Sequence, residues 1–329
     1  MLLNTVEYSD FDFEAIKRLE DFVPDKVADA HAHLFDTRFL PTSHNHPKDV
    51  AADFSTYQKC MMPILCTPKE LRLNVIPFPE ATMRDTSSGN LKKSDEFVAS
   101  LIEKNPENVY EIIVLPNETA EQIEKRLTSP RIRGLKCYYF LSDKPNSAQL
   151  PIGDYLPESA WEVAKKHKLC ITLHLVKSKA LADEENLSYI KEMTKRYPDV
   201  VLILAHAARS FASWTAFETV EKICHTENIM YDFSAICETP AMFQILKKVG
   251  VDRCMWGSDF PVSLMRGRPI SVADGFYWLG EGEKENIPNQ WIVVCENLLA
   301  VRQTCMMLDF SKTQIEKLFW GTAANLWGF

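Results

Sequence analysis

The chain has 329 residues, of which 46% are hydrophobic and 25% are charged, and its 37 basic and 45 acidic side chains give a formal net charge of −8. These fractions are typical of a soluble globular protein and exclude a disordered or fibrous chain. The acidic balance argues against a general surface for nucleic acids or anionic membranes, so we expect neither as a partner.

The cysteines and the N-terminus indicate the compartment. Nine cysteines occur without a C-x-x-C pair, and several lie within apolar runs such as KLCITL. This pattern predicts buried free thiols in a reducing compartment rather than disulfides. The first residues, MLLNTVEYSDFDFEAI, carry acids where a signal peptide needs bases, and no apolar run approaches the ~20 residues of a membrane-spanning helix. We therefore expect a cytoplasmic protein.

Short apolar runs alternate with amphipathic runs from about residue 25 to 265, which predicts strands alternating with helices. The continuous Val, Ile and Leu content fits parallel strands that are buried on both faces. Eight such units favour a closed (β/α)8 TIM barrel of the α/β class over a doubly wound sheet. The candidate strands are residues 26–35, 71–78, 109–115, 131–139, 169–176, 200–208, 228–235 and 253–260.

The domain organisation follows from this repeat. We expect residues 1–24 to be a lead-in segment and residues 25–329 to form one barrel domain. Residues 78–94 and 265–300 are predicted as long loops after the second and eighth strands, at the carboxyl-terminal face where such barrels build active sites. The tail from residue 311, SKTQIEKLFWGTAANLWGF, predicts a final amphipathic helix that closes the bottom or side of the barrel.

Residue types that bind metals end four of the eight predicted strands. His31 and His33 are two residues apart on the first strand, so they share one face. His174, His206 and Asp259 follow on strands five, six and eight. A lone histidine in an apolar strand is usually a satisfied core residue, but five such groups meeting at one mouth predict a zinc-type centre with room for a water.

In this order the motifs resemble the amidohydrolase superfamily. The detail is similar to its amidohydrolase-related branch, which includes aminocarboxymuconate-semialdehyde decarboxylase, resorcylate-type decarboxylases and several lactone hydrolases. The similarity spans roughly residues 28 to 329 and is specific for the superfamily rather than for a substrate. The matching segments are DAHAHLFD, RGLKCY, ITLHL, LILAHAAR, MWGSDFP and IEKLFWGTAANLWGF.

The resemblance implies that His31, His33, His174 and Asp259 bind one divalent metal, which we expect to be zinc, with manganese as the alternative. His206 would then hydrogen-bond the water on the metal or the substrate oxygen, as a base or an electrophile. Asp259 could also shuttle the proton, so the expected catalytic residues are His206 and Asp259.

Lys136, in the segment GLKCYY, leaves two alternatives open. Binuclear members of the superfamily use a carboxylated lysine at the end of strand four, and a second ion could then bind His174 and His206. In the related branch a similar lysine is free to meet an anionic substrate. We favour the single-metal alternative.

Three arginines are candidates for binding a substrate carboxylate, because guanidinium groups bind carboxylates through two hydrogen bonds. They are Arg38, Arg84 and Arg209. A second H-x-H pair, His44 and His46, lies in a Pro-flanked loop without a strand beneath it, and we do not expect it to bind the metal.

These features predict a metal-dependent hydrolase that acts through activated water on a small carbonyl substrate, a lactone, ester or amide bearing a carboxylate. The alternative is a metal-dependent non-oxidative decarboxylase, a carboxy-lyase of an aromatic or unsaturated acid, whose ring Phe260, Trp278 or Tyr139 could contact. A metal-stabilised scaffold without activity is a third hypothesis, but a scaffold has no need of an open metal position. The expected partner is a small molecule, and a homo-oligomer is left open.

Overall fold

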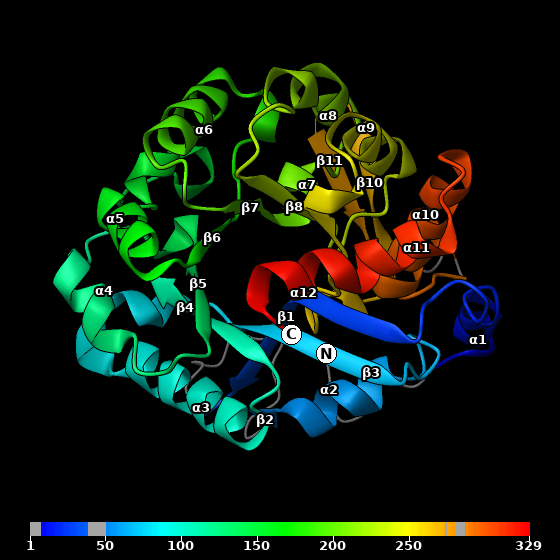
Figure 1. Cartoon of the computed structure of the whole chain (residues 1–329), viewed down its shortest axis with the longest axis horizontal. Coiled ribbons are helices and arrows are strands. Elements are labelled where there is room, and N and C mark those ends of the chain that lie inside the picture. The colour runs from blue at the N-terminus through cyan, green and yellow to red at the C-terminus, as the bar shows by residue number, and fades with distance from the viewer. Residues whose placement is uncertain (1–7, 39–50, 274, 281–286, 288) are drawn as a thin grey trace.

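The computed structural model describes residues 8–38, 51–273, 275–280, 287 and 289–329 (Figure 1). Eight parallel strands follow one another in chain order, each hydrogen-bonded to the next, and helices surround them. The strands are β1 (Lys26–Asp36), β3 (Glu70–Pro77), β4 (Val109–Val114), β5 (Ile132–Cys137), β6 (Cys170–Leu173), β7 (Leu202–Leu204), β8 (Ile229–Asp232) and β9 (Cys254–Met255). Each of the eight predicted segments contains a strand, although several of these strands are shorter than predicted.

The sheet closes where the segment after β9 pairs with β1. The backbone N of Ala30 donates to Trp256 O at 3.1 Å, and that of His33 donates to Phe260 O at 2.7 Å. A parallel bridge joins Ala32 to Phe260. These contacts complete the predicted (β/α)8 barrel, to which the short strand β2 (Ala51–Ala52) adds an antiparallel pair beside β1.

Several helices begin at residues whose side chains cap them. Before α4, the Thr119 side chain accepts a hydrogen bond from the backbone N of Gln122, and Oε1 of Gln122 accepts one from the backbone N of Thr119. Ser9, Asp53 and Asp183 cap α1, α2 and α6 in a similar way. The helices are α1 (Asp10–Lys17), α2 (Phe54–Met61), α3 (Asn90–Lys104), α4 (Ala120–Arg126), α5 (Glu158–His167), α6 (Glu184–Arg196), α7 (Ala205–Arg209), α8 (Trp214–Thr219), α9 (Thr239–Val249), α10 (Val293–Met307), α11 (Lys312–Glu316) and α12 (Thr322–Trp327).

The tail closes the bottom of the barrel, as predicted. In Figure 1 the helix α12 lies across the ring of strands. Its residues Ala323 and Trp327 pack in one buried cluster with small and apolar side chains from five strands. The strand residues of this cluster are Ala28, Ala30, Val109, Cys170, Ile203 and Met255. The opposite face of the barrel is therefore the open one.

A polar group lies inside the barrel. Glu111 Oε1 accepts hydrogen bonds from Asn74 Nδ2 and from Thr172 Oγ1, both at 2.7 Å. Gly134 stands opposite Glu111 on β5, and a Cβ there would lie 2.9 Å from the Glu111 side chain and 2.7 Å from Cys170 Sγ. Glycine at this position thus makes room for a buried carboxylate below the mouth.

Residues 265–300 were predicted as one long loop, but their described part contains regular structure. They contain the antiparallel hairpin β10 (Arg268–Val272) and β11 (Gly275–Leu279), followed by the start of α10. The hairpin is anchored because Arg268 donates to Cys237 O at 2.7 Å and to Glu296 at 3.2 Å. Residues 78–94 likewise hold two short 3₁₀ turns and the start of α3.

Three smaller expectations concern the cysteines, membrane helices and the second H-x-H pair. All nine cysteines are free, and all but Cys66 are buried. Within the described part of the chain, no helix is both long and apolar enough to cross a membrane. His44 and His46 lie outside the described residues.

Asn297 on α10 joins the helix to the ends of two strands. Its amide donates to Phe233 O at 2.7 Å and Ile236 O at 2.6 Å, and its carbonyl accepts from Trp256 Nε1 at 2.9 Å. We expect Asn297→Ala to lower the free energy of unfolding by about 3 kcal/mol, because three buried polar groups lose their partner. Thermal or urea unfolding measures this. Gln303 is exposed on the same helix, and Gln303→Ala should change the free energy of unfolding by less than ~0.5 kcal/mol. Equal losses of stability in both variants would contradict the role given to Asn297.

Candidate metal centre

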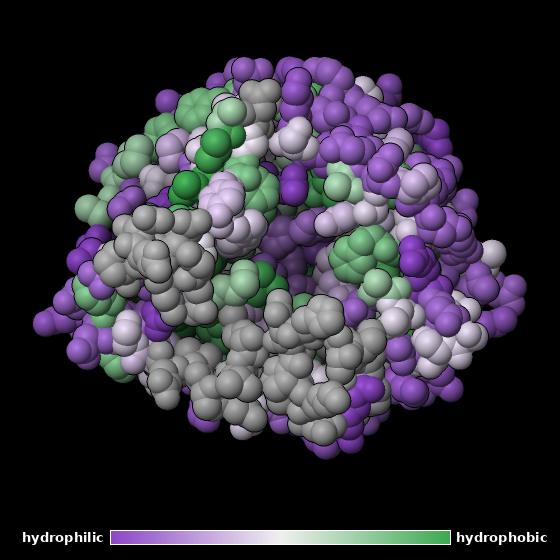
Figure 2. Space-filling model, turned by 180° about the vertical axis from the view of Figure 1, so that it is seen from behind, coloured by the Kyte–Doolittle hydropathy of each residue, from purple (hydrophilic) through white to green (hydrophobic). Residues whose placement is uncertain are grey.

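The open face of the barrel is hollowed. Figure 2 shows the side of the molecule opposite to that in Figure 1, with a hollow near its centre. Hydrophilic residues lie inside the hollow and apolar residues gather around it. The carboxyl ends of the strands reach this face, because α12 closes the other end.

A bulge in β1 lets its two histidines face the interior. Between Asp29 and Ala32, β1 has one residue more than β3, its neighbour. An extra residue reverses which side chains face the interior. Asp29 therefore points toward α2, where it accepts from Tyr57 Oη at 2.6 Å. His31 and His33 both face the mouth, with ring centroids 5.1 Å apart, as the H-x-H spacing predicts.

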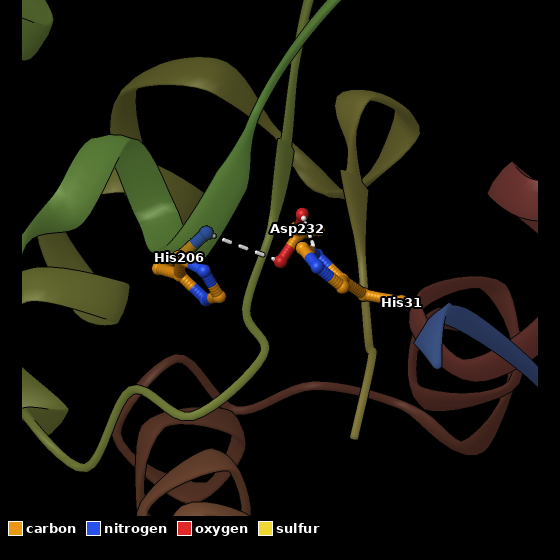
Figure 3. A group of neighbouring side chains, drawn as sticks. All are labelled: His31, His206 and Asp232. Atoms are coloured by element: carbon orange, nitrogen blue, oxygen red, sulfur yellow. Dashed lines mark hydrogen bonds and ion pairs between the residues drawn. The ribbon is translucent and has the colours of Figure 1, made fainter. Parts of the chain in front are cut away.

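One buried carboxylate, Asp232 at the end of β8, links His31 on β1 to His206 in the turn after β7 (Figure 3). Its Oδ2 accepts from Nδ1 of His31 at 3.0 Å, and its Oδ1 accepts from the backbone N of His206 at 3.2 Å. The carbonyl oxygen of Ser234 lies 3.1 Å from Nδ1 of His206. Because these oxygens accept, Nδ1 of both rings carries the proton and Nε2 keeps its lone pair, as in histidines that bind metals.

His33 and Asp259 complete a second group with His31. Nδ1 of His33 lies 3.2 Å from the carbonyl oxygen of Ile76, so its Nε2 also has a free lone pair. Oδ1 of Asp259 lies 3.3 Å from Nε2 of His33 and 3.7 Å from Nε2 of His31. Such spacings suit one ion, because two bonds of about 2.1 Å leave ligand atoms roughly 3 to 4 Å apart.

The predicted ligands are thus brought to one mouth, but not equally closely. One ligand atom from each of His31, His33 and Asp259 can be chosen within 4.8 Å of the others, and the same holds for His31, His206 and Asp232. His174 belongs to neither of these two groups and lies beside His206, with the centroids of the two rings 5.0 Å apart. That His174 completes the ligand set stays a prediction.

The protonation states of the side chains in this site favour the binding of a cation. Burial lowers the pKa of His31 to about 3 and that of His174 well below its ordinary value. Burial alone would raise the pKa of Asp232 and Asp259. The interactions of these carboxylates with the neighbouring histidines have the larger effect and hold both pKa values below the usual range. At neutral pH these imidazoles are neutral and both carboxylates are ionised, which are the forms that bind a divalent ion.

Lys136 on β5 is fully buried beside the histidines. Its Nζ lies 3.4 Å from Nε2 of His31 and 5.2 Å from the ring centre of Tyr138. Burial lowers its pKa, and the Glu111 and Asp232 carboxylates act in the opposite direction. The structure therefore places Lys136 at the mouth, which both of its predicted roles require.

The segment carrying His206 departs from the sequence prediction. Residues 200–208 were expected to be one strand, but β7 ends at Leu204 and the chain then makes a left-handed turn. The φ angles of residues 206–209 are 54°, 50°, 58° and 59°. A non-glycine residue in this region costs roughly 1–2 kcal/mol, so surrounding contacts must hold the turn. These contacts include the hydrogen bonds of His206 to Asp232 and of Arg209 to Lys177.

Arg209 lies at the mouth beside aromatic side chains. Its guanidinium is 5.0 Å from the ring centre of Phe276 on β11, and its Nη1 donates to Lys177 O at 2.8 Å. Phe211 lies between the hairpin and His206, with its ring centroid 4.7 Å from that of Phe276 and 5.8 Å from that of His206. Within the described residues no carboxylate pairs with Arg209, which leaves donors available for a ligand.

The other two candidate arginines make different contacts. Arg84 donates to Ser142 O at 3.0 Å. Arg38 forms an ion pair with Asp36, and its side chain is 65% exposed. Part of their hydrogen-bonding capacity is therefore used in contacts within the protein, and a role in binding substrate stays a prediction for both.

Sequence reasoning missed four residues of this site. They are Glu111, Tyr138, Asp232 and Ser234. Asp232 had a usable signal, since it is a carboxylate at the end of a predicted strand in the segment YDFSA, as Asp259 is in GSDFP. The other three had none, because a glutamate within a strand, a tyrosine after one and a serine in a loop are common in any barrel.

A family model described as Amidohydrolase matches residues 28–329. The chain belongs to the amidohydrolase family. It is therefore an enzyme, and its family acts on small molecules. Among curated protein sequences, none matches this amidohydrolase.

Solved structures of similar fold include enzymes of two reaction classes. The 2,6-dihydroxybenzoate decarboxylase of Rhizobium is 11% identical with a TM-score of 0.59, covering 92% of this chain and 98% of that one. A candidate 2-pyrone-4,6-dicarboxylic acid hydrolase of Pseudomonas putida is 13% identical with a TM-score of 0.58, covering 92% and 97%. A zinc-bound amidohydrolase of Burkholderia multivorans is 12% identical with a TM-score of 0.60, covering 92% and 99%. At these identities the likeness establishes the barrel fold alone.

Asp232→Asn tests how the site prepares its histidines. The amide cannot accept at both positions, so Nδ1 of His31 loses its fixed partner, and we expect zinc affinity to fall ~10- to 100-fold. Competition with a chelating dye measures the affinity. Asp252→Asn, which alters an exposed ion pair with Lys317, is the matched control and should bind zinc as the wild type does. Unchanged affinity in Asp232→Asn would show that the carboxylate does not orient a ligand.

Proposed function

We propose that this amidohydrolase is a metal-dependent hydrolase of a small carbonyl compound that carries a carboxylate, such as a lactone, ester or amide. One observation carries the proposal: the Nε2 atoms of His31 and His33 meet the ionised Asp259 carboxylate within the hollow mouth. This donor set suits a divalent ion and leaves a hollow beside it for a substrate.

We propose that His31, His33, His174 and Asp259 would hold one ion, zinc in the first instance and manganese as the alternative. When bound, such an ion supplies a Lewis acid that polarises a carbonyl group and lowers the pKa of water toward ~7. The single-ion proposal is consistent with Lys136, whose Nζ lies 3.4 Å from Nε2 of His31 and could instead meet an anionic substrate.

The remaining residues of the mouth would handle protons and charge. His206, whose Nδ1 is fixed by Ser234, has Nε2 available to accept a proton from water. Asp259 lies beside His33 and could hold the proton until the leaving group takes it. Arg209 has no carboxylate partner in the described part of the chain, and an anionic group of the substrate would offset the cost of its partial burial.

The alternative proposal is decarboxylation of an aromatic or unsaturated acid at the same site. The aromatic side chains beside Arg209 favour it, because Phe211, Phe276 and Trp278 form a group of rings 4.7 to 6.4 Å apart. Tyr139 stacks on His174 at 6.0 Å and could contribute to the same surface. Phe260 packs instead against Tyr57 at 5.2 Å.

Metal content tests the proposed centre. We expect elemental analysis of protein purified without chelators to find about one zinc or manganese per chain, and almost none in Asp259→Ala, because the variant loses an anionic ligand. The Asp252→Asn variant should retain the ion. Two ions per chain would indicate that Lys136 is also a ligand. Absence of an ion from the wild-type protein would contradict the proposal.

Product analysis separates the two reactions. Lactones, esters and aromatic acids would be incubated with zinc-loaded enzyme in water enriched in ¹⁸O. A hydrolase yields an acid that contains the label, whereas a decarboxylase releases CO₂ and incorporates a proton in its place. Labelled acid without CO₂ supports hydrolysis, and CO₂ without labelled acid supports the alternative.

Arg209→Gln tests recognition of the carboxylate. We expect KM for a carboxylate-bearing substrate to rise ~10- to 100-fold, because a hydrogen-bonded charge pair contributes about 1.5–3 kcal/mol. The kcat value should change little, and a methyl ester of the same substrate should show no difference between wild type and variant. Arg84→Gln is the comparison, and an increase in KM for Arg84→Gln alone would transfer the role to that residue.

A further inference from the structure

The hydroxyl of Tyr138 is buried and has no partner among the residues that the structure describes. Tyr138 follows β5, and its residue is 4% exposed. Its hydroxyl oxygen makes no hydrogen bond to any described residue. Buried tyrosines usually satisfy this group, because an unpaired polar atom is unfavourable in the interior. Tyr138 thus carries an unpaired donor in a buried position, and its neighbours decide what that donor can meet.

Its surroundings are those of the proposed reaction centre. The ring of Tyr138 lies 5.2 Å from Nζ of Lys136 and 6.1 Å from the ring of His174. Phe140 packs against it at 5.5 Å. Burial raises the pKa of Tyr138 well above its ordinary value, and the Asp259 carboxylate is the foremost charge that adds to this. The hydroxyl thus keeps its proton at neutral pH and remains a hydrogen-bond donor.

We propose that Tyr138 is a further catalytic residue, whose hydroxyl donates a hydrogen bond to the substrate oxygen on which negative charge develops. The proposal rests on the hydrolase function given above. A donor already fixed in a dry site stabilises such an oxygen without reorganising during the reaction. No described residue accepts a hydrogen bond from this hydroxyl, which leaves it available when the substrate arrives.

The chemistry that Tyr138 would assist balances as follows. The water oxygen forms a bond to the carbonyl carbon while the π electron pair moves onto the carbonyl oxygen, which accepts the hydrogen bond from Tyr138. His206 or Asp259 takes the proton from the water. The electron pair then returns, the bond from carbon to the leaving oxygen or nitrogen breaks, and the leaving atom takes that proton. Tyr138 keeps its own proton throughout.

Tyr138→Phe removes the hydroxyl and leaves the ring. We expect kcat to fall ~100-fold, as for the loss of one donor to a developing oxyanion, with KM changed less than ~3-fold. We also expect Tm to be equal to or higher than that of the wild type, because the lost hydroxyl has no partner within the described part of the chain. A structural role would instead lower Tm.

Tyr231→Phe is the matched control. Tyr231 on β8 is also fully buried, and its hydroxyl also lacks a partner among the described residues. The charged and ionisable groups that influence it are Cys254, Arg253 and Cys224 rather than residues of the mouth. This variant should keep or raise Tm in the same way and should leave kcat unchanged.

Binding of phenylphosphonate gives a readout that does not depend on turnover, because this tetrahedral anion resembles the product of water addition to a carbonyl. By calorimetry, we expect zinc-loaded Tyr138→Phe to bind it ~10-fold or more weakly than the wild type and Tyr231→Phe. Benzoate, which is planar at its carboxylate, should bind all three alike.

Several results would overturn the role of Tyr138. They are a loss of several degrees in Tm for Tyr138→Phe alone, equal phenylphosphonate affinity in all three proteins, and no saturable binding of phenylphosphonate to the wild type. Failure of the proposed function is a separate result, namely a wild-type enzyme that hydrolyses no lactone, ester or amide. The binding and Tm comparisons judge Tyr138 in that case too.

Discussion

The arrangement of the site depends on the hydrogen bonds of one buried carboxylate. Asp232 accepts from the ring of His31, from the backbone of His206 and from the hydroxyl of Ser234. A buried carboxylate is tolerated only when such partners surround it. The need to satisfy Asp232 therefore fixes the tautomer of His31, the start of the left-handed turn at His206 and the loop after β8. Groups from three strands are held in one geometry by one side chain.

The interior of the barrel divides into an apolar floor and an acidic mouth. Trp327 and the small residues of β1 fill the floor, so water and substrate can enter from one end. Above them burial raises the pKa of Glu111 to about 7, with Lys136 acting against the rise. Asp232 and Asp259 remain ionised nearby. The mouth thus holds more negative than positive charge, which a divalent cation would balance.

The strands and the residue types at their ends could be predicted because both depend on local patterns. His31, His33 and Asp259 were found since ligand-type residues at the ends of parallel strands must meet. The hairpin β10–β11 was mistaken for a loop, because Pro, Gly and charged residues in RGRPISVADGF obscure its alternation. The bulge in β1 had no signal either, since it depends on register with β3. The H-x-H prediction succeeded because both histidines follow the bulge.

The turn at 206–209 also affects how the protein folds. Ala207 and Ala208 avoid left-handed backbone angles in an unfolded chain, so this segment cannot form its turn early or alone. It can do so only once β8 presents Asp232 to His206 and Lys177 accepts from Arg209. His206 should consequently reach its place only after β8 has paired with β7, and leave it early when the protein begins to unfold. A chain with a complete barrel and normal secondary structure can therefore still lack an assembled site.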